Sequence, residues 1–321
     1  MNIFNREEKQ VQYIELVYDL IFVYMVGKNN ALLSNFEGGF ASPGAFMAYV
    51  LCTLAVIQIW NFTTFYINMF GRNGVRDHVF LFINMYLMYF IGESTRQDWQ
   101  PYQAQYHIAW GLILVNIGCQ YLLELRNHGA DVWNVDIIKR MALTLFAEAA
   151  LVFAAVFASP YAGMILSAIA VLFGIVLTIL GRGKSPGGTI DFMHLTERAM
   201  LYVVFTFGEM VIAIAAYFNG DGSFDLNSIY SSLMAFLMVG GLFLSYEVVY
   251  EHILDREKDD GGMLYMAIHI FIIFTLNNIT SALEFMREDE VSILPKILFM
   301  VFSVVGYYAF LLCLGRQYAK K

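Results

Sequence analysis

Residues 11–30 read Val-Gln-Tyr-Ile-Glu-Leu-Val-Tyr-Asp-Leu-Ile-Phe-Val-Tyr-Met-Val-Gly-Lys-Asn-Asn, and this stretch decides how the chain folds. It is long and apolar enough to cross a bilayer, yet it contains Glu15 and Asp19, four residues apart. On a helix the two acids lie about 40° apart on one face. An acid near the middle of a bilayer costs about 2.5–3.5 kcal/mol, so that face must meet protein or a wet cavity. We therefore expect the other helices to surround it.

The composition is typical of a polytopic membrane protein. Of the 321 residues, 59% are hydrophobic and 14% are charged, whereas soluble domains are about 45–50% apolar and about 25% charged. The formal charge of −8 comes with no basic cluster, so membrane lipids rather than nucleic acid are the expected partners. The three cysteines lie in separate apolar runs without metal-ligand spacing, and we predict no metal and no cofactor. Glu7 and Glu8 are atypical of a signal peptide.

Apolar runs of about 20 residues recur along the sequence and predict ten transmembrane helices in one all-α domain, 1–321. We expect the helices at 11–32, 45–69, 77–95, 104–126, 138–158, 160–181, 192–218, 227–251, 262–285 and 293–315. Gly and Pro residues in the connectors favour helix ends at these places. The connectors are too short to hold a soluble domain.

Positive charges predict the orientation of the bundle. If the N-terminus is cytoplasmic, that side carries fourteen of the 19 Lys and Arg residues: Arg6, Lys9, Arg72, Arg76, Arg126, Lys139, Arg140, Arg182, Lys184, Arg256, Lys258, Arg316, Lys320 and Lys321. The other side carries four, Lys28, Arg96, Arg287 and Lys296, and Arg198 lies inside a helix. The positive-inside rule predicts this asymmetry. We therefore expect a multi-pass protein of the cell membrane with both chain ends in the cytoplasm.

A weak internal repeat is predicted from helices 11–32 and 192–218. Glu15 and Glu197 each lie about one turn from the cytoplasmic end of their helix, and both helices are rich in aromatic residues. Helices 1–4 and 7–10, within 11–126 and 192–315, would then form parallel repeat halves, with 138–181 as a linker pair. Transporters often contain such symmetry.

Three segments resemble the bacterial low temperature requirement A (LtrA) family. The run Ile14–Val23 is similar to the family's opening E-L-x-x-D-L-x-F-V signature, and His194–Arg198 with Phe207-Gly208-Glu209 resembles its H-x-x-E-R…G-E helix. The helix with Trp60, Thr64, Tyr66, Asn68 and Phe70 resembles an aromatic helix ending in N-x-F, whereas the stretch 71–77 departs from the family's acidic segment. The resemblance implies a multi-spanning protein of a bacterial cell membrane. It implies little about activity, because the family is named for growth in the cold.

The acids of helix 11–32 are the first candidate site. They lie at the start of a helix face that also carries Tyr18 and Phe22. Acids inside a membrane suit a proton or cation pathway. Arg198 is the one Lys or Arg that the count assigns to neither side of the membrane, and it lies at a similar depth, so we expect a charge-assisted pair with Glu15 or Asp19. Such a pair serves either as a gating contact or as a static lock between two helices.

Further acids extend this candidate pathway. Glu197 and Glu209 lie on helix 192–218, and Glu148 lies midway along an Ala-rich helix, where it needs a partner inside the bundle. Glu209 has no obvious cation at its depth, and the sequence leaves open whether it carries protons or only forms a hydrogen bond with a neighbour. Glu284, near an outer helix end, is expected to be solvated.

Histidine and aromatic side chains complete the candidate set. His194, beside the inner mouth, and His269, inside helix 262–285, suit a proton relay because imidazole titrates near neutral pH. The alternative for each is a buried histidine whose hydrogen bonds are satisfied. The predicted aromatic lining consists of Tyr18, Trp60, Tyr66 and Tyr202, the last on the same face as Arg198 and Glu209. Ordinary helix packing explains these rings equally well.

Three functions fit these residues. The first is a proton-linked secondary transporter or channel for a small solute or ion, which acids at successive depths favour. The second is a ligand-binding membrane sensor for a lipid, haem or quinone, or an intramembrane enzyme, although no catalytic motif is present. The third is a structural protein that adapts the membrane to cold. We favour the first without assigning a substrate, and a homo-oligomer is compatible with it.

Overall fold

The computed structural model describes residues 9–96, 100–128, 132–180, 190–218, 226–258 and 260–320. Ten helices of 17 residues or more occur in these ranges: α1 (Tyr13–Asn29), α2 (Pro43–Phe70), α3 (Val75–Ser94), α4 (Gln103–Leu123), α6 (Val132–Val156), α7 (Pro160–Leu180), α8 (Phe192–Ala215), α9 (Leu226–Val248), α10 (Met263–Phe285) and α11 (Ile293–Tyr318). The short elements are η1 (Asn30–Ser34), β1 (Phe36–Glu37), β2 (Phe40–Ala41), η2 (Gln100–Tyr102), α5 (Leu125–His128), η3 (Ala216–Phe218) and η4 (Val249–Ile253). The prediction of an all-α bundle with about ten helices is confirmed.

Two of the helix starts follow from local capping signals. Ser42 accepts a hydrogen bond from the Ala45 N–H at 3.3 Å, and Pro43 begins α2, where a missing N–H costs nothing. Asp191 caps α8 in the same way through the His194 N–H at 3.0 Å. The start of α8, and with it the depth of the polar residues on that helix, is therefore set by its own sequence.

A short hairpin follows α1 where the sequence predicts only a connector. Gly38 and Gly39 have φ angles of 63° and 86°, which other residues rarely adopt, and they form the turn between β1 and β2. The Gly39 carbonyl accepts a hydrogen bond from the Ser292 N–H at 2.7 Å. The hairpin is thereby tied to the start of α11.

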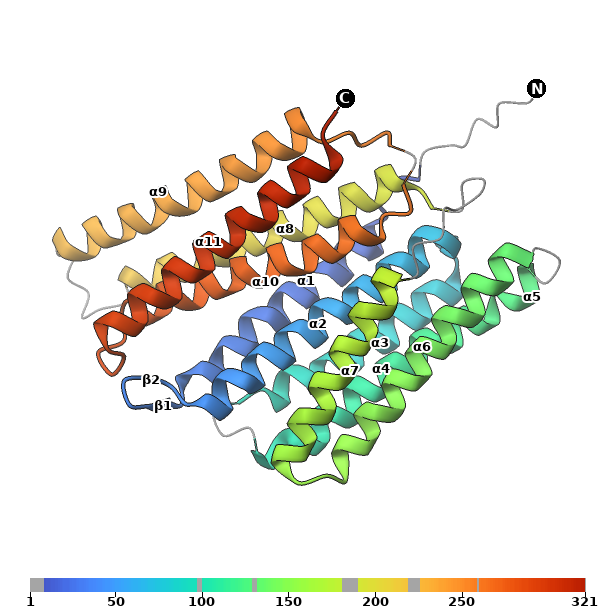
Figure 1. Cartoon of the computed structure of the whole chain (residues 1–321), viewed down its shortest axis with the longest axis horizontal. Coiled ribbons are helices and arrows are strands. Elements are labelled where there is room, and N and C mark those ends of the chain that lie inside the picture. The colour runs from blue at the N-terminus through green and yellow to red at the C-terminus, as the bar shows by residue number, and fades with distance from the viewer. Residues whose placement is uncertain are drawn as a thin grey trace.

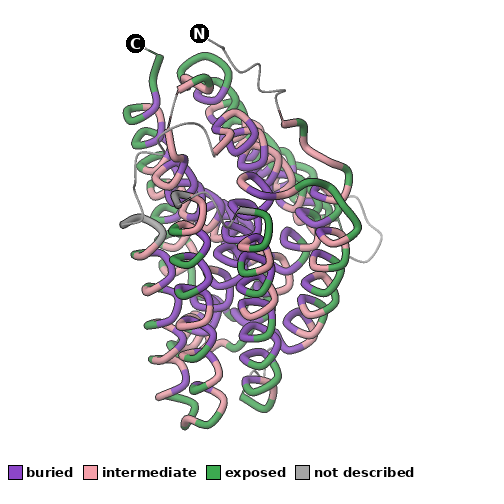
Figure 2. The backbone as a smooth tube through the Cα atoms, turned by 90° about the vertical axis from the view of Figure 1, so that its right-hand side faces the viewer, coloured by how far each residue is buried: buried purple, intermediate pink, exposed green. Residues whose placement is uncertain are grey.

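Apolar side chains cover the outside of the bundle. Seven of the helices in the described ranges are long and apolar enough to cross a membrane, namely α2, α4, α7, α8, α9, α10 and α11. Phe82, Leu172, Phe236 and Phe302 are each more than half exposed on outer helices, and Figure 2 shows buried positions inside and exposed ones along the outer faces. Exposed apolar surface of this extent marks contact with lipid. The chain is therefore an integral membrane protein.

α1 and α2 lie at the centre of the bundle. Figure 1 shows α8 to α11 on one side of them and α3, α4, α6 and α7 on the other, and α1 contacts α2, α3 and α8. Both ends of the described chain lie at the same end of the bundle. The Lys9 N–H donates to Asp191 at 3.2 Å, and the Tyr318 ring stacks on Phe192, the next residue along α8. An even number of passes explains this arrangement.

Contacts within the two predicted repeat halves follow a similar order. α1 contacts α2 and α3, and α3 contacts α4; in the same way α8 contacts α9 and α10, and α10 contacts α11. The likeness does not extend to burial, because α2 lies at the centre of the bundle whereas its counterpart α9 lies at the edge. The repeat of 11–126 and 192–315, with a linker at 138–181, stays a prediction.

Candidate functional site

The polar face of α1 meets a single arginine of α8. Arg198 is completely buried and binds Asp19 through two hydrogen bonds, from Nε to Oδ2 at 3.1 Å and from Nη2 to Oδ1 at 2.5 Å. Its Nη1 donates to Oε2 of Glu15. The sequence predicts a pair with one of the two acids, and the structure contains a cluster with both. Glu15 is 2% exposed and Asp19 is 0% exposed, so neither carboxyl group faces lipid.

Aromatic side chains from α2 and α8 close one side of the cluster. Trp60 Nε1 donates to Oδ1 of Asp19 at 2.8 Å. Tyr202, one turn after Arg198, packs edge-on against the Trp60 ring with 4.6 Å between centroids. Both oxygens of Asp19 are therefore occupied by donors from α2 and α8, and both rings are completely buried.

Tyr18 lies in the same stripe of α1 as the acids. Its ring packs on Phe22 with 4.7 Å between centroids. Its hydroxyl shares a hydrogen bond with Thr63 at 3.0 Å and accepts one from Asn84 Nδ2 at 3.2 Å. These bonds join α1 to α2 and α3. Tyr18 and Phe22 therefore continue the packed segment of α1 beyond Asp19.

His194 lies beside the cluster, and its hydrogen bond with Asn68 fixes its tautomer. The Asp191 N–H donates to Oδ1 of Asn68 at 3.0 Å, so the Asn68 amide nitrogen is the atom that lies 3.0 Å from Nδ1 of His194. Because an amide nitrogen only donates, Nδ1 must accept, and the ring proton lies on Nε2. Nε2 in turn lies 3.3 Å from Oε2 of Glu15. His194 is therefore a neutral ring whose Nε2 lies beside Glu15 without forming a hydrogen bond to it.

A large open cavity lies between this cluster and the end of the bundle that holds both chain ends. Its volume is about 1020 Å³ and its lining includes Lys9, Glu15, Asn68, Asp77 and Asp191; we call it the terminal-side cavity. Lys9 Nζ donates to backbone carbonyls at the end of α2, and burial lowers the pKa of this ammonium below its ordinary value. Glu15 thus borders the cavity on one side and binds Arg198 on the other.

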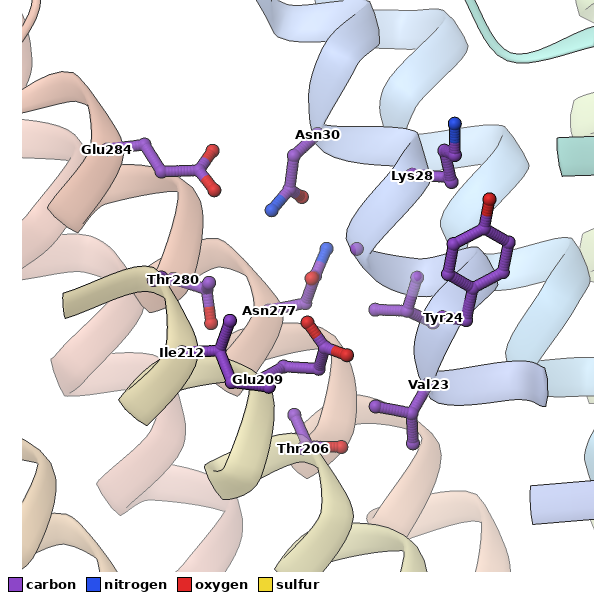
Figure 3. A pocket seen from close by; sticks show the side chains of 13 residues that line it. Val23, Tyr24, Lys28, Asn30, Thr206, Glu209, Ile212, Asn277, Thr280 and Glu284 are labelled. Carbon is purple, nitrogen blue, oxygen red and sulfur yellow. The ribbon is translucent and has the colours of Figure 1, made fainter. Parts of the chain in front are cut away.

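A smaller cavity of about 260 Å³ lies toward the opposite end of α1. We call it the distal cavity; its lining includes Val23, Gly27, Lys28, Asn30, Thr206, Glu209, Asn277, Thr280 and Glu284, from α1, η1, α8 and α10 (Figure 3). Glu209 therefore lines a cavity, and Lys28 is a cation in the same lining. Glu284, expected at the solvated interface, also lines this cavity.

Glu15, Asp19 and Arg198 form what we call the ion cluster. The two cavities lie on either side of it along α1. The terminal-side cavity touches α1 at Glu15 and the distal cavity begins at Val23, which places them eight residues, or about 12 Å, apart along the helix. Asp19 lies midway between these two positions. The pair formed by Asp19 and Arg198, with Trp60 packed against it, occupies the stretch between the cavities.

Glu148 lies outside this cluster. It is completely buried on α6 and faces α2, where Gln58 Nε2 lies 3.5 Å from its Oε2. Gly174 on α7 leaves room for the carboxyl group, because a side chain there would collide with it. The partner inside the bundle that the sequence predicts for Glu148 is therefore an amide. Among the described residues Glu148 forms no ion pair.

His269 and Glu197 also lie apart from the ion cluster. His269 Nδ1 lies 2.9 Å from the Tyr265 carbonyl, so it donates, and Nε2 lies 3.0 Å from the Tyr246 hydroxyl, from which it accepts. Both ring nitrogens are thus satisfied in a buried aromatic cluster, which is the alternative that the sequence left open. Glu197 is partly exposed on α8 and takes no part in the contacts around Arg198.

Tyr66 belongs to a different polar network from Trp60. Its hydroxyl donates to Oε1 of Glu124 at 3.0 Å and accepts from Arg76 Nη2 at 3.3 Å. Arg76 also forms an ion pair with Glu124 and lies 3.7 Å from Asp77. We call these four residues the α3–α4 cluster. The predicted aromatic lining is therefore divided between two clusters.

Two amides were not recognised as site residues from the sequence. Asn68 fixes the tautomer of His194, and Asn277 lines the distal cavity. The available signal was an amide inside an apolar helix, which needs a partner just as an acid does. The described residues contain no group of three or more His, Cys, Asp or Glu arranged to hold a metal ion.

The family model described as bacterial low temperature requirement A protein (LtrA) matches residues 10–321. The match covers nearly the whole chain and includes the three segments whose residues suggested the resemblance, around Glu15, Trp60 and Arg198. No curated protein and no solved structure matches the chain.

Proposed function

We infer that this chain, which belongs to the bacterial low temperature requirement A (LtrA) family, is a proton-linked secondary transporter or channel for a small solute or ion. The observation that carries the proposal is the position of the ion cluster. Asp19 and Arg198 occupy the stretch of α1 between two cavities that lie toward opposite ends of the bundle. A closed gate between two access routes has this arrangement.

Charge balance within the cluster supports a link to protons. Glu15 and Asp19 contribute two negative charges when ionised, Arg198 contributes one positive charge, and His194 is neutral in its fixed tautomer. An uncompensated buried charge costs several kcal/mol. One proton held between the two carboxyl groups makes the cluster neutral. That proton can be exchanged through the terminal-side cavity, which Glu15 borders.

Opening the gate requires separation of Arg198 from Asp19. A second proton on the cluster weakens the attraction between them, and a solute that binds the open form better shifts the equilibrium toward it. Transfer of a proton between Glu15 and Asp19, one turn apart, would move charge toward the distal cavity. Proton movement and solute access are coupled in this scheme because both change the same ion pair.

The orientation in the membrane follows from the positive-inside rule. The terminal side carries the predicted excess of Lys and Arg, and we propose that it faces the cytoplasm of a bacterial cell. Arg6, Arg182, Lys184 and Lys321, which contribute to that excess, lie outside the described residues.

The experiment uses full-length protein in liposomes with an imposed pH gradient, followed with a pH-sensitive dye. Alkali-metal chlorides, quaternary amines, amino acids and sugars are added in turn. We expect one solute class to dissipate the gradient faster than in protein-free liposomes, and Asp19→Asn to abolish this effect. Asp136→Asn, on the exposed surface of α6, is the matched control and should transport normally. Solute-driven proton movement that is absent, or that Asp19→Asn leaves intact, would disprove the proposal.

A further inference from the structure

Two threonine hydroxyl groups in the lining of the distal cavity offer it only lone pairs. Thr206 Oγ1 donates its proton to the Tyr202 carbonyl at 2.9 Å, and Thr280 Oγ1 donates to the Leu276 carbonyl at 3.1 Å. Both side chains line the cavity and are no more than 4% exposed. A hydroxyl whose proton is engaged can only accept. A ligand of these oxygens must therefore supply a donor or a positive charge.

Asn277 adds an amide oxygen with no partner. The residue is 2% exposed, and its Nδ2 donates to the Tyr49 hydroxyl at 2.8 Å. No hydrogen bond reaches its Oδ1 among the described residues, and Figure 3 shows the amide beside the Glu209 carboxyl group. An ionised Glu209 and the Asn277 amide oxygen are both acceptors, and a cation or a donor between them would hold them together favourably.

The charged side chains that line the cavity indicate the sign of the ligand's charge. Glu209 and Glu284 both line the cavity, and neither forms an ion pair with a described residue. Lys28 lies with Nζ 5.6 Å from the Tyr24 ring centroid, and Figure 3 shows its side chain directed away from Glu209. Arg287 lies over another tyrosine ring. Two carboxyl groups around a small cavity repel anions and attract cations.

The size of the cavity indicates a small ligand with some of its water. The volume of about 260 Å³ exceeds that of a bare alkali ion and leaves room for water beside it. Gly27 contributes to this space, since a Cβ there would lie 3.4 Å from Oε2 of Glu209. The described residues offer no third acid for a multivalent metal.

We infer that the distal cavity binds a small monovalent cation, either a partly hydrated alkali ion or a small primary ammonium. Glu209 supplies the charge, and Asn277, Thr206 and Thr280 supply neutral oxygens. The inference rests on the proposed function in treating this cation as the transported or coupling solute. It gives that transporter a substrate class and a binding site on the side of the ion pair away from the chain ends.

Purified full-length protein in detergent tests the inference by thermal unfolding, followed through tryptophan fluorescence. NaCl, KCl or methylammonium chloride replaces choline chloride at constant ionic strength, so that only the identity of the cation changes. A ligand that binds the native state raises the unfolding temperature saturably. We expect at least one of the three cations to do so, and its identity to distinguish an alkali ion from an ammonium.

Variants of the lining residues test whether the cation binds in the distal cavity. Glu209→Gln should weaken the apparent affinity at least about 10-fold, which corresponds to about 1.4 kcal/mol, and Thr280→Val should weaken it less. Glu93→Gln is the matched control, because Glu93 is an exposed acid that pairs with Arg96 at 3.2 Å. It should bind as the wild type does. If Glu209→Gln does not fold, Thr280→Val against Glu93→Gln still decides the assignment.

Three outcomes would overturn the inference: no saturable effect of any monovalent cation, an effect confined to Mg²⁺ or Ca²⁺, or full affinity in Glu209→Gln and Thr280→Val. Binding in detergent needs no passage across a membrane, so the two proposals fail separately. Proton movement driven by a neutral solute, with no cation binding, removes this inference alone. Cation binding without any solute-driven proton movement removes the proposed function alone.

Discussion

The described residues contain two clusters in which one arginine meets two carboxyl groups, and these differ chiefly in how far the arginine is exposed. In the cluster between α1 and α8, Arg198 binds Glu15 and Asp19, and its side chain is 0% exposed. In the α3–α4 cluster, Arg76 pairs with Glu124, lies 3.7 Å from Asp77, and is 34% exposed. An aromatic donor joins each cluster, from Trp60 to Asp19 and from Tyr66 to Glu124.

The difference in access changes what the same set of charges can do. Around Arg76, whose side chain is 34% exposed, water and salt can screen the charges of the pair. Around Arg198 both carboxyl groups are at most 2% exposed, and we propose that a proton offsets the second charge. Identical formal charges therefore give an ordinary structural ion pair at one place and a candidate proton site at the other. The following predictions test this contrast.

Arg198→Ala should have the largest effect. It leaves Glu15 and Asp19 buried without their cation, and breaking a buried pair in this way costs about 3–5 kcal/mol. The free energy of unfolding in mixed detergent micelles, measured by denaturant titration, checks this. A loss below about 1 kcal/mol would show that the cluster is not closed to solvent.

A triple variant tests whether the same cluster opens and closes a gate or only holds α1 and α8 together. Glu15→Gln, Asp19→Leu and Arg198→Met together remove every charge at similar volume, and such replacements are often neutral or stabilising. We expect stability close to the wild type but no solute-driven proton movement. Transport that survives in this variant would assign the ion pair a purely structural role.

Arg76→Ala should cost less, about 1–3 kcal/mol, in the range of a hydrogen bond to a charged group. Glu124 keeps two donors, since Tyr66 donates at 3.0 Å and Asn127 donates at 3.0 Å. The effect should shrink in 1 M salt, where the screening length falls to about 3 Å, whereas the effect of Arg198→Ala should not. If the stability loss of both variants depended equally on salt, the proposed difference between the two clusters would be contradicted.

Lys9→Met should have the smallest effect, about 1 kcal/mol or less, from loss of a cation at the C-terminal end of α2. The pKa of Lys9 is lowered in the folded protein, chiefly by burial, from an ordinary value of 10.5. Between these two pKa values the unfolded chain binds more protons, so the free energy of unfolding of the wild type rises with pH relative to Lys9→Met. Unfolding curves over this pH range check the sign; a fall would contradict it.

The sequence was sufficient for the local features of the α1–α8 cluster. The spacing of Glu15 and Asp19 placed them on one face, and the cost of exposing them to lipid required that face to be buried. Arg198 was the one Lys or Arg assigned to neither side of the membrane, which made it the expected partner. Each of these inferences uses one helix, or the depth of a residue in the membrane, and needs no knowledge of which helices are neighbours.

The assignment of neighbours could not be predicted in the same way. α2 is buried on nearly all sides, so its pattern does not reveal that Trp60 faces α1 and α8 whereas Tyr66 faces α3 and α4. For the same reason Glu148 and His269 could not be separated from the ion cluster by their sequence positions. The place of Glu284 beside Glu209 likewise depends on the packing of α10 against α8.

The sequence by itself determined the membrane environment, the ten helices and the presence of buried charge, because hydropathy and the cost of a charge in lipid act residue by residue. Only the tertiary structure decided which charges meet, which of them water reaches, and where cavities remain. Those properties depend on side chains from different helices filling or leaving the same space. That is why a proton site is proposed at Glu15 and Asp19, and a cation site at Glu209.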